Sequence, residues 1–321
     1  MADKKNQHFV PKFYLRKFQS CEKEPLYVFN LENMKRGYSA KIKPSFPAAI
    51  CYKEYYYNID RDLPISVGKR PKQYIENNVN GFYENKIPKI IEKIISESAL
   101  SLREATLFSD FIIHLKVRNP YQELLNERSK IQRLTEISSK RYDFFRNEAF
   151  ERGIPKDIFD VVYQKSIKSL LNKENLTQEL QKESLIRKYE NPEENYKKFR
   201  DAIVSSSWKL LELDDNSDFF LTTDNPGVAL DSKGIIHNTK FLNGFNFYLP
   251  LSPKHSLRIT DMELNIIEND IFLIEREKID SSVVKDINKL SSSVSNNLII
   301  SNSKDNLQRF LDQNFAKENG I

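Results

Sequence analysis

Glycine, cysteine and long apolar runs are all scarce in this 321-residue chain. There are 8 glycines, and neither G-x-x-x-x-G-K-[ST] nor G-x-G-x-x-G occurs, so the usual signatures of P-loop and Rossmann nucleotide binding are missing. The two cysteines, Cys21 and Cys51, are too isolated for a C-x-x-C zinc site, and we expect two free thiols. No apolar run approaches the ~18 residues of a membrane span, and MADKKNQ lacks a signal-peptide core. These absences predict a soluble, cytoplasmic protein with no membrane partner.

The residues that are abundant favour a folded, aromatic-cored protein. Hydrophobic residues make up 39% of the chain and charged residues 30%, with 21 Phe and 15 Tyr, which argues against overall disorder. The net charge of +5 decides little, but residues 1–53 hold eleven basic and four acidic residues. Such a basic region favours an anionic partner such as a phosphodiester backbone. The alternative is a solvated, lysine-rich surface without a partner.

Strand patterns near both ends of the chain flank a long helical middle section. Residues 25–30 (PLYVFN) predict a strand, and YVFNLENMKRGYSAKI predicts two short strands around a turn at Arg36-Gly37. We interpret 121–211 as a helical insertion or lid within a single domain over 1–321. After Trp208 the pattern predicts strands over 219–223, 227–230, 245–251 and 256–260, a helix over 280–293, a strand over 298–301 and a helix from Lys304. This order predicts an α+β fold with a mixed or antiparallel sheet built from N- and C-terminal strands.

Two amphipathic helices are predicted before the middle section, over 73–98 and 102–118. Pro88 is expected either to kink the first helix or to start it, because proline lacks a backbone donor. Asn119-Pro120 should end the second helix. Within the middle section, Asn191 is the expected N-cap of a helix, with Glu194 closing a capping box.

Polar residues border the apolar faces of these two helices. His114 and Arg118 are four positions apart at one edge of the second apolar stripe, while Glu76 and Glu84 lie on or beside the first. Buried charges are rarely unpaired, so an ion pair of Arg118 with Glu84 or Glu76 is one reading. The other is an arginine that points into a cleft and binds phosphate or carboxylate.

The opening stretch QHFVPKFYLRKF, residues 7–18, places one of only four histidines on an extended lead-in. Pro11 pushes the residue before it to extended geometry, and YLRKF then begins a helical turn on which Tyr14 and Phe18 share a face. His8 is then either a general base or metal ligand, or a histidine with one structural hydrogen bond in an arm pinned by aromatics.

Two turns follow hydrophobic strands near the C-terminal third. In FFLTTDNPGVAL, Asp224 and Asn225 precede Pro226-Gly227, which predicts either an Asx-turn or a carboxylate presented at a strand end for metal or base chemistry. In FYLPLSPKHSLRI, Ser252 and His255 lack a nucleophile-elbow context, which argues against a serine hydrolase.

This set of motifs resembles the microbial family called domain of unknown function 4238, whose opening reads H-x-x-P-x-x-Y-L-x-x-F. The resemblance extends through ICYKEYYYN, the helices with Glu84 and Arg118, the L-T-T-D-N-P turn and the Y-L-P-L-S-P strand, in the expected order. It implies no stated activity. It does imply motif positions at His8, Pro11, Tyr14, Leu15, Phe18, Glu84, Arg118, Asp224, Asn225, Pro226, Pro250, Ser252 and Pro253.

Two functions of different classes are compatible with these residues. The first is a phosphodiesterase or nuclease of the toxin or phage-defence type, with His8, Glu84, Arg118 and Asp224 converging in one site and with His8, Glu84 and Asp224 as candidate ligands of a divalent metal such as Mg²⁺ or Mn²⁺. The second is a non-catalytic sensor or binding module for nucleic acid or protein, in which these residues are structural. In the first, we expect the substrate to contact Tyr14, Arg16, Lys17 and Asn225.

Overall fold

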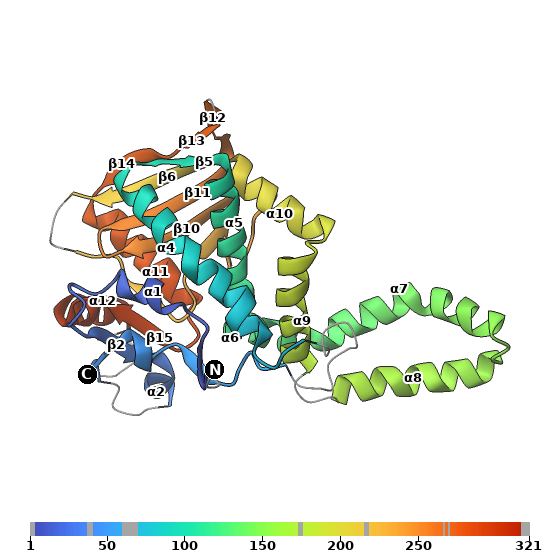
Figure 1. Ribbon diagram of the computed structural model, residues 1–321. Helices are drawn as coiled ribbons and strands as arrows, with labels where there is room; N and C mark the ends of the chain where they lie inside the picture. The colour runs from blue at the N-terminus through green and yellow to red at the C-terminus, as the bar shows by residue number, and fades with distance from the viewer. Residues whose placement is uncertain are drawn as a thin grey trace.

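The computed structural model has the predicted α+β architecture (Figure 1). Two sheets and the helices around them form a body, from which one pair of helices projects to the side. The structure describes residues 4–36, 41–59, 70–172, 176–214, 218–265, 267–268 and 270–315. None of the helices in these ranges is both long enough and apolar enough to cross a membrane.

The larger sheet has six strands from the C-terminal half of the chain. Its order is β14-β6-β11-β10-β8-β9, and all neighbours are antiparallel except β14 and β6. The predicted strands over 227–230, 245–251 and 256–260 are confirmed here. The strands are β6 (Ser206–Leu213), β8 (Val228–Asp231), β9 (Ile236–His237), β10 (Phe245–Ser252), β11 (His255–Leu264) and β14 (Glu275–Ile279).

A second, four-stranded antiparallel sheet joins the two ends of the chain. Its order is β3-β2-β15-β7, so a strand near the C-terminus lies between strands from the N-terminal region and from the 222–223 turn. The strands are β2 (Leu26–Asn30), β3 (Lys43–Ser45), β7 (Thr222–Thr223) and β15 (Leu298–Ser301). Smaller ladders pair β1 (Asn6–His8) with β4 (Tyr52–Glu54), and join β12 (Ile267–Glu268), β13 (Ile271–Leu273) and β5 (Ala99–Ser101).

Helices α4 (Gly81–Ser96) and α5 (Leu102–Val117) cross one face of the six-stranded sheet in Figure 1. The π-helical turn η2 (Ile75–Asn80) precedes α4. A capping box between Ser101 and Glu104 begins α5, and Phe108 of this helix packs on Trp208 with 5.7 Å between ring centroids. Burial of these aromatic faces holds α5, and therefore Arg118 at its C-terminal end, in a fixed place. The other helices of the body are α1 (Lys12–Arg16), α2 (Leu31–Lys35), η1 (Pro47–Ala49), α11 (Ser281–Ser293) and α12 (Lys304–Phe315).

The middle third is helical, as predicted. It consists of α6 (Pro120–Arg128), α7 (Lys130–Glu151), α8 (Lys156–Asn172), α9 (Leu176–Glu190) and α10 (Glu194–Ser205). Helices α7 and α8 form an antiparallel hairpin that extends away from the body (Figure 1). The helical section ends at Ser205 rather than near 211, because residues from Ser206 onward pair with β11.

Two local expectations were wrong, and a third lies partly outside the described residues. Strands β2 and β3 pair antiparallel, but helix α2, with Asn30 as its N-cap, follows β2 directly; Gly37 of the turn expected at Arg36-Gly37 lies outside the described residues. Of the two expectations for Pro88, a helix start is wrong, because α4 begins at Gly81 and buried isoleucines before and after Pro88 hold both halves against the core. The N-cap of α10 is Glu193 and it accepts no side-chain capping bond, so the expected Asn191 box does not form.

Candidate functional site

The opening stretch folds as an extended arm followed by a short helix, as predicted. His8 pairs with Tyr52 in the β1–β4 ladder, and their ring centroids are 5.5 Å apart. Pro11 occupies the N-cap position of α1 without a side-chain capping bond, and the rings of Tyr14 in this helix and Phe18 just after it have centroids 5.5 Å apart. Both aromatic side chains are fully buried and anchor the arm in the core.

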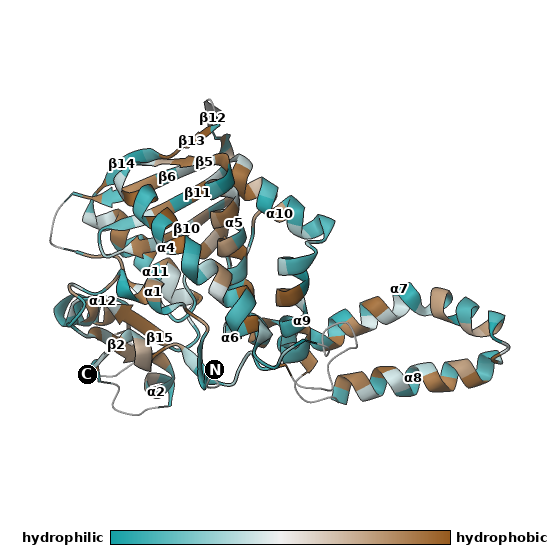
Figure 2. Ribbon diagram, viewed as in Figure 1, coloured by the Kyte–Doolittle hydropathy of each residue, from teal (hydrophilic) through white to brown (hydrophobic). Residues whose placement is uncertain are grey.

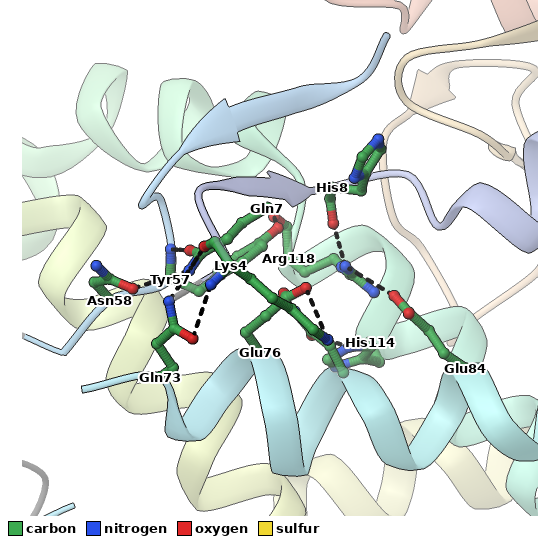
Figure 3. A network of polar contacts seen from close by, with 11 residues as sticks. Lys4, Gln7, His8, Tyr57, Asn58, Gln73, Glu76, Glu84, His114 and Arg118 are labelled. Carbon is green, nitrogen blue, oxygen red and sulfur yellow. Dashed lines mark hydrogen bonds and ion pairs between the residues drawn. The ribbon is translucent and has the colours of Figure 1, made fainter. Parts of the chain in front are cut away.

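Arg118 connects this arm to the helices below it (Figure 3). Its guanidinium donates a hydrogen bond from Nη2 to the carbonyl oxygen of His8, and the same nitrogen lies 3.7 Å from Oε1 of Glu84. The ring of Tyr57 lies under the guanidinium at 5.5 Å, and its hydroxyl donates to the Arg118 carbonyl oxygen at 2.6 Å. The ion pair with Glu84 is therefore confirmed. Arg118 is 0% exposed, and its Nε and Nη1 have no hydrogen-bond partner.

A second group of polar contacts lies beside Arg118 on η2 and α5. Asn80 donates to Oε2 of Glu76 at 2.9 Å, and its own Oδ1 lies 3.0 Å from Nε2 of His114. His114 also stacks on Tyr83 with 4.4 Å between centroids. Burial lowers the pKa of His114 well below its ordinary value. His114 is thus a neutral, hydrogen-bonded core residue.

Sequence reasoning missed Gln7, which fixes the arm from the other side. Its Oε1 accepts a hydrogen bond from the backbone N–H of Tyr57 at 2.5 Å, and its Nε2 donates to Oδ1 of Asn58 at 2.9 Å. Gln73 similarly exchanges hydrogen bonds with the backbone of Lys4. Figure 3 shows these amides converging on the first residues of the arm. Gln7 precedes the recognised histidine by one position, but nothing in its spacing marks it as buried.

A cavity of about 420 Å³ opens where the arm meets η2 and α4. Its lining combines basic and acidic side chains with the histidine of the arm: Lys4, Lys5, Asn6, His8, Lys12, Glu76 and Glu84. The side chain of Glu84 is 30% exposed, whereas Arg118 lies fully buried behind it. A molecule in this cavity would therefore meet Glu84 and the lysines before it met Arg118.

The imidazole of His8 has an unusual environment for a residue at a cavity. Burial, together with the positive charges of Lys12 and Arg118, lowers its pKa to about 4, so the ring is neutral at pH 7. Its Nε2 is buried and has no hydrogen-bond partner. Figure 3 shows that the carbonyl of His8 points toward Arg118 while the ring points away from it. The backbone of His8 therefore contacts the arginine, and the imidazole does not.

Asp224 and Asn225 belong to a different part of the interior. The carboxylate of Asp224 accepts hydrogen bonds from the backbone N–H groups of Asn296 at 2.9 Å and Asn297 at 2.7 Å. Burial raises the pKa of this carboxyl to about 6, although these N–H groups act in the opposite direction. Lys116 is fully buried beside it and donates to Oδ1 of Asn225 at 2.8 Å.

The remaining turn contacts are also internal. The ammonium of Lys116 donates to the carbonyl oxygens of Pro226 at 3.1 Å and Gly227 at 2.7 Å. Asn225 donates from Nδ2 to Asn238 and to the Val294 carbonyl. The predicted turn is present, but Asp224 does not line the cavity beside Glu84. The structure thus brings His8, Glu84 and Arg118 together and leaves Asp224 out.

The other expected contact residues lie outside the cavity lining. Tyr14 is fully buried, and its hydroxyl donates to the Pro250 carbonyl oxygen at 2.5 Å. Arg16 is exposed on α1, and Lys17 pairs with Glu92 at 2.8 Å. His255 Nδ1 lies 2.9 Å from Oγ of Ser252 within the β10–β11 hairpin. We see the Ser252 contact as local to the turn, because the two residues are three positions apart.

The described part of the chain offers no cluster of three or more His, Cys, Asp or Glu side chains that could hold a metal ion. His8, Glu84 and Asp224, the expected ligands, do not form one. Both cysteines are free thiols, Cys21 exposed and Cys51 buried, as predicted.

Comparison with known proteins agrees with the order of motifs along the chain. Searches for similar curated proteins and for similar solved structures found no match. A family model described as "Protein of unknown function (DUF4238)" matches residues 6–305, from the start of the arm to the beginning of α12. This match covers nearly the whole chain and includes the arm, Glu84, Arg118 and both strand-end turns, so the chain belongs to the DUF4238 family.

Proposed function

We propose that the protein binds and cleaves a phosphodiester, with nucleic acid as the substrate class and the cavity beside Glu84 as the site. One observation carries this proposal: a single cavity of about 420 Å³ is lined by three lysines and by a carboxylate paired with a buried arginine. Lysines attract and neutralise phosphate oxygens, and a positioned carboxylate can accept a proton from a nucleophile.

The three lysines supply the positive charge for binding. Lys4 and Lys5 have side chains more than half exposed, and Lys12 is exposed at the start of α1. Both lysines line the cavity; Lys5 also pairs with Glu54 at 3.1 Å, and Lys4 with Glu76 at 3.8 Å. Their place in a basic N-terminal region makes a polyanion a better fit than a neutral ligand.

Glu84 is the candidate catalytic residue in this proposal. Its carboxylate would take the proton of an attacking water or ribose hydroxyl as that oxygen bonds to phosphorus. The bond from phosphorus to the leaving oxygen then breaks, and a lysine ammonium or water returns a proton to that oxygen. Arg118, 3.7 Å from Glu84 and fully buried, acts as a positioning residue that holds the carboxylate by an ion pair.

A non-catalytic binding module is the second candidate, and the contacts of Arg118 favour it. This guanidinium binds the His8 carbonyl and Tyr57, which are structural partners within the chain. In this reading Glu84 only holds Arg118, and the lysines bind nucleic acid without cleaving it. The two candidates differ in whether bound nucleic acid is broken.

Cleavage of labelled RNA and DNA by the purified full-length protein, in Mg²⁺, Mn²⁺ or EDTA, tests the proposal. Glu84→Gln should lose cleavage and keep binding, while Glu92→Gln, an exposed carboxylate on the same helix, should keep both. His8→Ala shows whether the imidazole takes part. Binding without cleavage by the wild-type protein would support the second candidate, and neither binding nor cleavage would contradict both.

A further inference from the structure

The α7–α8 hairpin is held together by its own aromatic seam. Tyr142 and Phe145 of α7 contact Phe159 and Tyr163 of α8, with ring centroids 5.3–6.3 Å apart across this group. The Tyr163 hydroxyl donates to the Ser138 carbonyl oxygen at 2.8 Å. No residue of α8 is buried within the described chain. The hairpin is therefore a rigid but largely solvated projection.

A second apolar stripe runs along both helices beside this seam. Its members are 52–58% exposed: Ile137, Phe144, Ile158, Val161 and Val162. At 100° per residue these positions are rotated by roughly 120° from the seam on each helix, and because the helices are antiparallel, both rotations point to the same face of the hairpin. Figure 2 shows apolar residues recurring along both helices out to the tip. A continuous exposed apolar face of this kind indicates an interaction surface.

The stripe begins in a cleft at the base of the hairpin. Ile137 is one wall of a cavity of about 430 Å³ that also includes Phe199 of α10 and Phe241. Basic side chains, including Arg133 and Lys188, line the same cavity, and none of the described residues that line it is Asp or Glu. An apolar group flanked by carboxylates would match this cleft.

The tip of the hairpin has that composition. Ile158, a member of the stripe near the start of α8, lies close to the tip and is 52% exposed. Glu148, which pairs with Arg152 at 3.3 Å, and Glu151 lie on the stripe side of α7. Phe150 is 76% exposed but lies ~130° round α7 from the stripe, on the other face. The tip of one hairpin presents an apolar side chain beside carboxylates. It therefore complements the apolar cleft with basic side chains on another chain.

Charges along the stripe follow the same polarity. Lys130, Ile137, Phe144 and Glu151 are spaced by seven residues, from a basic base to an acidic tip. On α8, Lys165 and Lys168 continue the stripe at the base end. From Ile137 to Phe150 the helix rises ~20 Å, so two hairpins laid antiparallel would place each tip at the other's base. Acidic and basic ends would then face each other twice.

The stripe is an apolar face exposed to solvent. With an aromatic side chain of ~200 Å², Phe144 alone exposes roughly 120 Å² at its 58% exposure. The four aliphatic members, at 52–55% exposure, extend the same face along both helices. A contiguous exposed apolar face of this kind marks a site of protein association.

We propose that this face is an interface between two copies of the chain, in which the hairpins pack antiparallel around a two-fold axis and each tip enters the other's basal cleft. The interface is isologous, so every contact occurs twice. It lies outside the Glu84 cavity, so it is independent of the proposed cleavage.

Charge reversal followed by mixing tests this arrangement. One variant carries Glu148→Lys and Glu151→Lys at the tip, and the other carries Lys165→Glu and Lys168→Glu at the base. All four residues are exposed, so the folds should be unaffected. We expect a wild-type dimer by light scattering or sedimentation, at least a tenfold weaker association of each variant alone, and recovery of a heterodimer when the two are mixed. Only the antiparallel pairing restores both tip-to-base contacts.

A matched variant controls for the loss of apolar surface. Phe144→Ser, in the stripe at 58% exposure, should weaken association, whereas Met262→Ser, an apolar residue on β11 at 62% exposure, should not. A wild-type protein that stays monomeric at every concentration overturns the proposal, including a monomer that instead binds anionic vesicles. A dimer that is indifferent to both charge reversals, or variants that do not recover on mixing, overturns it as well.

Discussion

Arg118 donates a hydrogen bond to the backbone carbonyl oxygen of His8 across 110 residues of sequence. The bond joins the end of α5 to the first strand, and the guanidinium has no access to solvent. Because the acceptor is a backbone atom, the contact depends on the path of the arm and not on the identity of residue 8. The polar group that holds the arm is thus the arginine, with Tyr57 and Glu84 around it.

Replacing Arg118 should destabilise the protein strongly. Arg118→Met leaves the His8 carbonyl and Glu84 without their buried partner, and removal of one member of such a pair costs about 3–5 kcal/mol. We expect a lower midpoint of denaturant unfolding and faster proteolysis within residues 4–18. Arg16→Met, at an exposed position of α1, should change stability by less than ~0.5 kcal/mol. Equal stability of the two variants would mean that the arm is held by its aromatics alone.

Gly227 in the 224–227 turn should tolerate no side chain. Its φ is +85°, and a Cβ built there would lie 2.5 Å from Cζ of Phe247. We expect Gly227→Ala to cost more than about 2 kcal/mol, since backbone strain and steric overlap add. Gly234→Ala is the matched control, because its φ is +76° with nothing within 4 Å, so it carries the strain alone. Thermal unfolding of both variants measures the difference between them. Equally small losses of stability in the two variants would contradict the prediction.

Tyr14 should prove structural even though it belongs to the opening motif. Tyr14→Phe removes a hydroxyl that donates to the Pro250 carbonyl and contacts Thr222, so a loss of ~1–3 kcal/mol in unfolding free energy is expected. Nucleic-acid binding should be unchanged, because the side chain is fully buried. Tyr55→Phe, at an exposed position, controls for the substitution itself. A variant with normal stability and impaired binding would assign Tyr14 to the ligand instead.

The pKa of His8 predicts a specific loss of stability in acid. The folded-state pKa is about 4 against an ordinary value of 6.5. As the pH falls from 6.5 toward 4, the unfolded chain takes up a proton that the folded chain does not, so stability decreases. The full loss is ~3 kcal/mol below pH 4. His8→Phe should therefore flatten the pH dependence of unfolding in this window.

The comparison must be made as a difference between the two proteins. His114 has a lowered pKa and acts in the same direction as His8. Asp224, whose pKa is raised to about 6, acts in the opposite direction, because its folded form binds a proton first as the pH falls. Subtracting the two pH profiles removes both contributions. A difference that is flat between pH 4 and 6.5 would show that His8 titrates normally.

Local patterns predicted the elements of this fold well, and long-range contacts poorly. The α5 stripe, the extended arm before Pro11 and the strand Leu298–Ser301 all depend on neighbours in sequence, and all are present. The Arg118–Glu84 pair could be predicted because both lie at the edges of apolar helix faces. Helical spacing alone reduced the candidate partners of Arg118 to two carboxylates, Glu76 and Glu84.

The role of Asp224 could not be predicted in the same way. Its partners are backbone N–H groups of Asn296 and Asn297, which follow α11. Because almost any residue supplies a backbone N–H, the sequence does not show which residues donate to Asp224. The buried ammonium of Lys116 was missed for a similar reason, since two of its three acceptors are carbonyl oxygens of the turn. A lysine on an amphipathic helix ordinarily indicates the solvent side.

The four-stranded sheet imposes an order on how the protein is made. Ile299 of β15 pairs with Phe29 of β2, so β2 has no permanent neighbour on that side until β15 has left the ribosome. Pairing of this kind, between distant segments, is slow and leaves strand edges open in the meantime. In the nascent chain one edge of β2 therefore stays open until Leu298–Ser301 is available, and a chain truncated before Leu298 would not complete the sheet.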